Sequence, residues 1–230
     1  MSTALFEKSA RKRDQFEVEL ASGDHLSQRE FHRLYSQSSI HKAELIDGIV
    51  HVASSVQADN HSYQHNKLAG WLMLYEAATP GVRASNNSTV ILDDENEVQP
   101  DELLMIQSPM GQASMNNKGY LTSAPEFVAE VAASSAHIDL HSKLKLYERH
   151  GVKEYLVWNT GGQEIRWFIR KGSRFVKLAA QQGILRSRVF PGLWLNEPAM
   201  LAFDLATVIA TLQEGLQSKE HATFVKMLGK

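Results

Sequence analysis

Apolar and polar positions near the start of the chain predict one short helix followed by one hairpin. Residues Ser27 to Glu30 (SQRE) form a capping box, in which two side chains bond the free N–H groups of a helix start. We expect this helix to turn Phe31, Leu34 and Tyr35 inward. Residues 43–52 place two apolar runs around an Asp-Gly pair, the strongest short-range signal for a β-hairpin.

A longer helix is predicted over 60–77, because Leu68, Leu72 and Tyr75 recur on one helical face. It should end before Thr79-Pro80-Gly81, a strong turn signal. Beyond it, apolar runs predict strands at 82–85, 89–92, 98–106, 127–131 and 154–158. Polar residues 107–122 read as a surface loop, and that length favours a functional one.

The order strand, helix, strand over 127–158 predicts a right-handed crossover between two parallel strands. Its helix spans 139–150 and ends at Gly151. A second hairpin should join 165–169 to 175–178, and residues 202–228 should be helical. These elements define an α/β class with a mixed sheet. We expect residues 1–24 to form a mobile N-terminal arm and 25–230 one domain with a C-terminal helical segment.

Composition narrows the function classes. The 230 residues are 43% hydrophobic, enough for one sizeable core, and no cysteine occurs, which excludes disulfides and thiolate zinc sites. No apolar run reaches about 18 residues and no signal-peptide pattern is present, so we expect a cytoplasmic protein without a membrane anchor. The net charge of −2 lacks the basic excess typical of nucleic-acid binding. Any DNA contact would then need local basic residues, for which the candidates are Lys118, Arg149 and Lys153.

Candidate chemistry lies in acids placed on neighbouring strands. Asp101 precedes one apolar run and Glu130 lies inside another, while Lys143 lies on the helix between the parallel strands. Carboxylate oxygens are ligands for Mg²⁺, and an ammonium can hold a water or offset charge on phosphorus. Each residue also has an ordinary interpretation. Asp101 is then a turn residue, Glu130 a partner of a lysine, and Lys143 one half of an exposed Asp139–Lys143 pair.

Other chemistries have weaker support. The pairs His61 with His65 and His137 with His141 have the spacing to share a metal, yet neither has the Glu of His-Glu-x-x-His or an obvious third ligand. We interpret them as surface histidines, with a small transition-metal enzyme as an open alternative. The sequence lacks a Gly-x-Gly-x-x-Gly motif, a Walker A loop and a Gly-x-Ser-x-Gly motif.

Between residues 27 and 195, short motifs follow one another in a specific order. They are residues 43–48 (AELIDG), His61 with Leu68 and Leu72, 99–101 (QPD), 119–121 (GYL), 124–126 (APE), 130–131 (EV), Lys143, 146–147 (LY), 151–152 (GV), 154–155 (EY) and 190–193 (FPGL). This ordered set resembles the Uma-type restriction endonuclease family, a bacterial branch of the PD-(D/E)XK nuclease superfamily.

The resemblance implies a restriction-endonuclease-like fold, with a central mixed sheet flanked by helices and a site that uses Mg²⁺, with Mn²⁺ as a substitute. Carried over by position, Asp101 and Glu130 would be metal ligands, Glu44 an additional acidic ligand, and Lys143 the basic residue of the site. The chain departs from the superfamily pattern at Ala132, where a lysine usually stands two residues after the glutamate, and at Ala133, where the family usually has a serine. The resemblance suggests that the lysine has moved to the helix, at Lys143.

We therefore expect a Mg²⁺-dependent endonuclease that hydrolyses DNA. The alternative is a catalytically weak or silent nucleic-acid-binding or dimeric scaffold module of the same fold, favoured by the missing basic excess. The late segment is rich in large apolar side chains and the C-terminal helix is apolar, which favours a homodimer unless the late aromatic residues only complete the monomer core. The large apolar residues of the late segment are Trp167, Phe168, Phe175, Phe190, Leu193 and Trp194.

Overall fold

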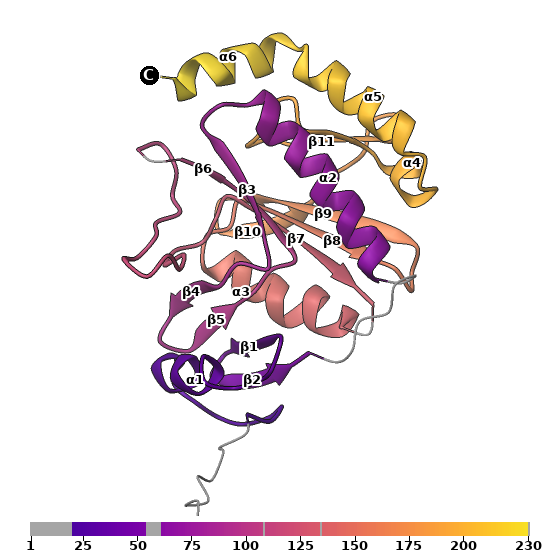
Figure 1. The fold of residues 1–230 in the computed structure, drawn as a ribbon. Coiled ribbons are helices and arrows are strands. Elements are labelled where there is room, and N and C mark those ends of the chain that lie inside the picture. Colours follow the sequence, from indigo (N-terminus) through magenta and orange to yellow (C-terminus); the bar gives the residue numbers. More distant parts are fainter. Residues whose placement is uncertain (1–19, 54–60, 108, 134, 230) are drawn as a thin grey trace, which may run out of the picture.

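The structure, a computed structural model, describes residues 20–53, 61–107, 109–133 and 135–229. It confirms the α/β class with a central mixed sheet flanked by helices (Figure 1). Most of the N-terminal arm predicted over 1–24 lies outside the described residues. Within the described ranges, no helix is both long and apolar enough to cross a membrane.

The larger sheet contains the predicted crossover. Its strand order is β10-β9-β8-β7-β6-β3. The bounds are β3 Val82–Asn86, β6 Glu102–Ile106, β7 Phe127–Ala132, β8 Glu154–Asn159, β9 Glu164–Lys171 and β10 Arg174–Lys177. β7 and β8 are parallel, whereas the other described neighbours in this sheet pair antiparallel. The helix between them begins as a π-helix, η2 (Ile138–Lys143), and continues as α3 (Leu144–Arg149).

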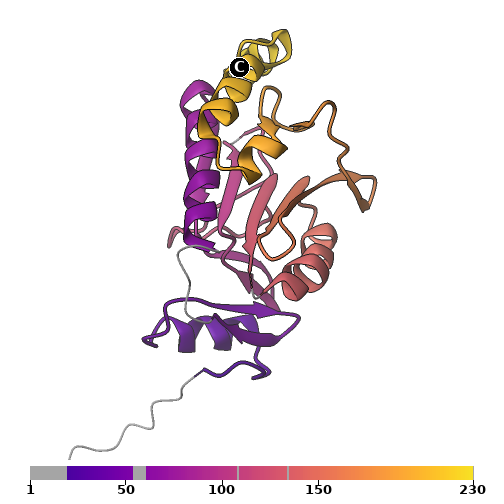
Figure 2. The same ribbon diagram turned by 90° about the vertical axis from the view of Figure 1, so that its right-hand side faces the viewer.

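Two layers of helix cover the two faces of this sheet (Figure 2). Successive side chains of a strand point to opposite faces, and β7 shows this alternation. Phe127, Ala129 and Val131 belong to the core under α2 (Tyr63–Ala78) and α5 (Leu205–Leu216). Val128 and Ala132 belong to the core under η2 and α3. Glu130 points to the same face as Val128 and Ala132, so η2 and α3 cover its side chain.

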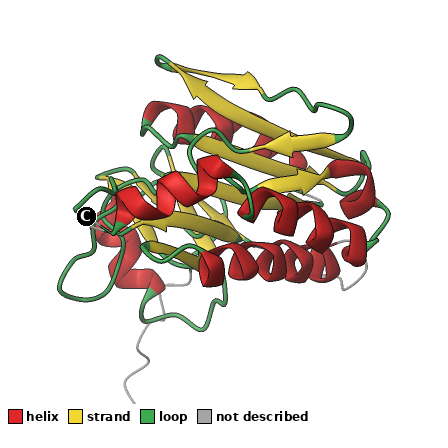
Figure 3. Cartoon of the chain, turned by 90° about the horizontal axis from the view of Figure 1, so that it is seen from above, coloured by secondary structure: helices red, strands yellow, loops and turns green. Residues whose placement is uncertain are grey.

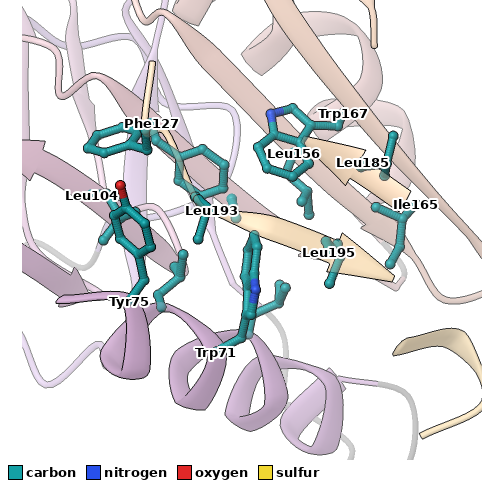
Figure 4. Packing of buried hydrophobic residues seen from close by; sticks show 14 of the residues in the cluster. Trp71, Tyr75, Leu104, Phe127, Leu156, Ile165, Trp167, Leu185, Leu193 and Leu195 are labelled. Atoms are coloured by element: carbon teal, nitrogen blue, oxygen red, sulfur yellow. The ribbon is translucent and has the colours of Figure 1, made fainter. Parts of the chain in front are cut away.

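Aromatic rings fill the core beneath α2 (Figure 4). Trp71 meets Phe127 and Trp167 edge-on, with ring centroids 6.4 and 5.9 Å apart. Trp167, Phe190 and Leu193 are fully buried within the chain itself. The interpretation that large apolar residues of the late segment complete the monomer core is therefore right for these three.

The smaller sheet has the order β2-β1-β5-β4 and carries α1 (Gln28–Tyr35). The hairpin of β1 (Ala43–Ile46) and β2 (Ile49–Val52) turns at Asp47 and Gly48, both with positive φ, as the Asp-Gly pair predicts. Ser27 caps α1 by accepting a hydrogen bond from the Glu30 N–H. The predicted helix start and hairpin are confirmed, and this unit lies at one end of the large sheet (Figure 1).

The single strand predicted over 98–106 is wrong. Asn96–Val98 is β5, which pairs with β1 and with β4 (Val90–Asp93), whereas β6 belongs to the large sheet. Pro100 has no N–H to donate to a strand ladder, so the chain leaves one sheet here and enters the other. The residues at this crossing, 99–101, are consequently free to bond side chains of the site.

The C-terminal part also differs from the single helical segment expected over 202–228. Two helices, α5 and α6 (Lys219–Leu228), occur among the described residues there, because Asp204 and Ser218 each cap a new helix start, and the short α4 (Glu197–Leu201) precedes them. A small ribbon of β11 (Ile184–Arg186) and β12 (Trp194–Asn196), absent from the sequence expectation, precedes them. Seen from above in Figure 3, the helices form layers against the sheet.

A close approach of backbone fixes α5 over the ribbon. Gly215 of α5 faces the turn at Gly192, and a Cβ at Gly215 would overlap the Gly192 carbonyl oxygen and lie 2.9 Å from the Trp194 ring. Gly192 has a φ of +88°, a conformation that favours glycine. These contacts give the FPGL motif a packing role.

We predict opposite effects for two glycine-to-alanine changes in helices. Gly215→Ala should lower the free energy of unfolding by about 1–3 kcal/mol, because backbone must move to admit the methyl group. Gly70→Ala in α2, where an added Cβ has nothing within 4 Å, should raise it by about 0.5–1 kcal/mol. Urea unfolding of both variants checks this, and equal effects would contradict the close approach.

Candidate active site

Four sequence-predicted residues meet where the two sheets join. Glu44 comes from β1, Asp101 from the crossing between β5 and β6, Glu130 from β7 and Lys143 from η2. All four are buried. The Lys143 Nζ lies 2.8 Å from Glu44 Oε2 and 2.8 Å from Glu130 Oε1. The structure thus brings all four predicted positions into one cluster.

Each of the Asp101 and Glu130 carboxylates is held by a backbone N–H group at or next to the other residue. The Val131 N–H donates to Asp101 Oδ2 at 2.8 Å, and the Asp101 N–H lies 3.3 Å from Glu130 Oε2. The first bond is available because Asp101 stands just before β6, opposite the end of the β6–β7 ladder. The two carboxylates therefore occupy fixed positions at this end of the sheet.

Glu44 lies on an inner strand of the small sheet and is buried. β1 lies between β2 and β5 in the small sheet, and the Glu44 side chain is about 10% exposed. Its Oε1 accepts a 2.7 Å hydrogen bond from the Gln99 N–H, one of the N–H groups freed where the chain changes sheets. Burial of an unpaired carboxylate is costly, and the Lys143 ammonium removes that cost.

Asp139 and Lys143 do not form the exposed surface pair that their spacing also allowed. Asp139 is 2% and Lys143 3% exposed, with 3.6 Å between Asp139 Oδ1 and Nζ. Ser135 Oγ donates to the other Asp139 oxygen at 2.6 Å. Sequence reasoning missed Asp139 as a site residue because an i, i+4 acid–base pair is usually solvated.

The departure at Ala132 has a geometric explanation. Ala132 lies on the same face of β7 as Glu130 and is fully buried beneath the crossover helix. The helix passes over this face, so Lys143 reaches Glu130 from above the sheet rather than along the strand. Tyr147, one turn further on, donates to the same Glu130 oxygen at 3.0 Å.

Three more residues complete the rim of the cluster and were missed as site residues. Lys42 Nζ lies 2.7 Å from Asp101 Oδ1, and His61 Nε2 lies 3.4 Å from Asp101 Oδ2. His65 Nε2 lies 3.0 Å from both the Asp101 carbonyl oxygen and a Glu102 carboxylate oxygen. The interpretation of His61 and His65 as surface histidines is therefore wrong. Their i, i+4 spacing at the start of α2 was the available signal.

The surroundings of Asp101 and Glu130 shift the pKa values of their carboxyl groups in opposite directions. Burial alone would raise the pKa of Asp101, but the hydrogen bond from His61 and the Lys42 ammonium hold that pKa well below its usual range. Burial raises the pKa of Glu130 to about 8; the Lys143 ammonium opposes this shift, and the Asp101 and Asp139 carboxylates add to it. Lys143 itself is fully buried, yet Glu130, Glu44 and Asp139 raise its pKa well above 10.5, so it stays an ammonium.

The donor set suits a hard cation. Among the residues that the structure describes, no three His, Asp or Glu side chains are already arranged around one metal position. The carboxylates instead contact the ammonium groups of Lys42 and Lys143. Mg²⁺ commonly uses only one or two protein carboxylates and keeps several waters, so Asp101 and Glu130 fit it as ligands. The rings of His137, the residue just before η2, and His141 of η2 lie 4.8 Å apart.

Comparison with known proteins identifies the family and supports the fold. Residues 28–198 match the family model described as "Uma2: Putative restriction endonuclease", and the chain belongs to this family. A solved structure described as a "putative nuclease belonging to DUF820", from Anabaena variabilis ATCC 29413, is similar with a TM-score of 0.57 and 14% identity. The similarity covers 83% of this chain and 99% of that one. A search of curated proteins gave no match.

We predict that Lys143→Met lowers the free energy of unfolding by about 3–5 kcal/mol, because it leaves buried carboxylates without a cation. The deficit should grow as pH rises. The pKa of Glu130 is about 8 in the folded state and about 4.5 in the unfolded chain. Between these two values the folded state keeps a proton that the unfolded chain has lost, so the free energy of unfolding falls as pH rises from 4.5 to 8.

Removing the cation should make that fall steeper. Lys145→Met, two residues away and exposed, is the matched control and should change stability by less than about 0.5 kcal/mol. Adding Glu130→Gln to Lys143→Met should restore part of the lost free energy of unfolding, because one buried carboxylate is then removed. Urea unfolding at pH 5 and pH 8 measures both effects, and equal unfolding energies for the Lys143 and Lys145 variants would contradict the buried cluster.

Proposed function

We propose that this protein is an endonuclease that hydrolyses DNA phosphodiester bonds with the help of Mg²⁺, for which Mn²⁺ can substitute. The observation that carries the proposal is the fixed pair of Asp101 and Glu130 carboxylates beside a buried ammonium. This arrangement belongs to the functional class that the family description names.

The charge balance of the cluster supports a divalent ion. Glu44, Asp101, Glu130 and Asp139 bring four negative charges, while Lys42 and Lys143 bring two positive ones, which leaves 2 − 4 = −2. Without another cation the cluster must hold protons, as the raised pKa of Glu130 shows. A divalent ion bound at these carboxylates would offset this negative charge.

Each residue then has a distinct role. Asp101 and Glu130 would be the ligands, and Glu44, whose two oxygens already bond Gln99 and Lys143, would act more peripherally. Lys143 would orient the attacking water and offset negative charge on the phosphorus. When bound, the metal would supply a water of lowered pKa and stabilise the leaving oxygen.

We predict that purified protein nicks plasmid DNA with Mn²⁺ or Mg²⁺ and stops when EDTA is added. Asp101→Asn and Glu130→Gln should each lower the rate by about 10²-fold or more, and Glu44→Gln by less, because the Gln99 N–H and Lys143 already bond both Glu44 oxygens. Asp94→Asn, an exposed acid of the small sheet, is the matched control. Nicking that persists in EDTA would rule out the metal mechanism.

A silent DNA-binding or scaffold module of the same fold is the competing proposal. The net charge of −2 favours it, as do the ammonium groups that already occupy the carboxylates. DNA binding without nicking under both metals would support it. In either case, we propose that Lys118, Arg149 and Lys153, all exposed, supply the contacts to DNA phosphates.

We propose a homodimer formed through the C-terminal helices, which the sequence also suggested, together with α2 rather than through the late aromatic residues. The late aromatic residues are largely internal, whereas Met73 and Leu74 of α2, Ile209 of α5 and Met227 of α6 are exposed apolar side chains. We predict that light scattering gives twice 25.8 kDa and that Met73→Glu with Ile209→Glu returns it to 25.8 kDa. A wild-type mass of 25.8 kDa at micromolar concentration would contradict the dimer.

A further inference from the structure

The two lysines of the cluster differ in exposure. Lys143 is enclosed, with a side chain about 4% exposed, whereas the Lys42 side chain is about 25% exposed. Lys42 stands immediately before β1 and reaches Asp101 Oδ1 at 2.7 Å, with Asn87 Oδ1 at 3.4 Å as a second neighbour. One ammonium is therefore built into the protein and the other lies at the rim.

The two Asp101 oxygens are also not equivalent. Oδ2 accepts from the Val131 N–H inside the large sheet and faces His61. Oδ1 is bonded by Lys42, a flexible side chain that can leave without disturbing any strand. A cation that binds Asp101 through Oδ1 must therefore displace Lys42, which holds that oxygen.

A metal ion and this ammonium cannot easily share that oxygen. Two cations on the same carboxylate oxygen would stand within a few ångströms of each other, where their repulsion is strong at a half-buried position. The ammonium is the mobile one, because Lys42 has a four-carbon stem and partial access to water.

We propose that Lys42 holds the metal position of Asp101 in the metal-free protein. Metal binding then displaces it, and the released ammonium binds a phosphate of DNA beside the metal. This inference rests on the proposed metal-dependent function. Lysine binds phosphate as a point charge, and an ammonium released at the rim is within reach of an anion brought to the site. Lys42 is thus a positioning residue for substrate and a competitor of the metal.

The test measures metal binding without DNA. Calorimetry with Mn²⁺ alone should give a Kd for Lys42→Met that is about tenfold tighter than wild type, which corresponds to about 1.4 kcal/mol. Lys145→Met removes the same charge from an exposed position nearby and should leave the Kd unchanged. Lys42→Arg keeps a cation on Asp101 and should not tighten it. A purely structural role for Lys42 would weaken metal binding on its removal, not strengthen it.

The second readout is DNA affinity, measured by fluorescence anisotropy in Ca²⁺ with the duplex confirmed uncut on a gel. Lys42→Met should bind DNA more weakly, with a slope of log affinity against log salt smaller by about one phosphate contact. An unchanged slope would overturn the phosphate contact. If wild type binds Mn²⁺ and Lys42→Met binds it no tighter, the displacement of Lys42 is ruled out, while the proposed metal-dependent function stands. If neither binds Mn²⁺, the proposed metal-dependent function fails as well.

Discussion

The buried ammonium of Lys143 is the interaction on which the rest of the site depends. It stands among carboxylates from the small sheet, the large sheet and its own helix, those of Glu44, Glu130 and Asp139. Each of these acids, buried alone, would be strongly destabilising. One cation makes the burial of all three tolerable, and it joins three separate elements at a single point.

This constraint explains several local features that would otherwise look unrelated. The crossover helix begins with a π-helical stretch that carries both Asp139 and Lys143, and π-helical turns often occur at functional sites. The chain changes sheets at Pro100, which frees the Gln99 and Asp101 N–H groups to bond Glu44 and Glu130. Backbone and side chains thus meet at the junction of the two sheets, and the site lies there.

Local patterns in the sequence determined most of the elements. The capping box at Ser27, the Asp-Gly turn and the nearly all-apolar run of β7 act over a few residues, so they are readable without tertiary contacts. The ordered motifs also predicted the family, which the match over residues 28–198 confirms, and the positions 44, 101, 130 and 143, which the structure brings into one cluster.

Tertiary structure alone decided the surroundings of those positions. Whether Asp139 and Lys143 are a solvated surface pair or a buried one depends on which face of the sheet their helix covers, and the i, i+4 spacing is the same in both cases. Lys42 and His61 reach Asp101 from segments 59 and 40 residues away in sequence, a distance at which no periodicity operates. Desolvation, which gives these contacts their energy, exists only once the chain has closed around them.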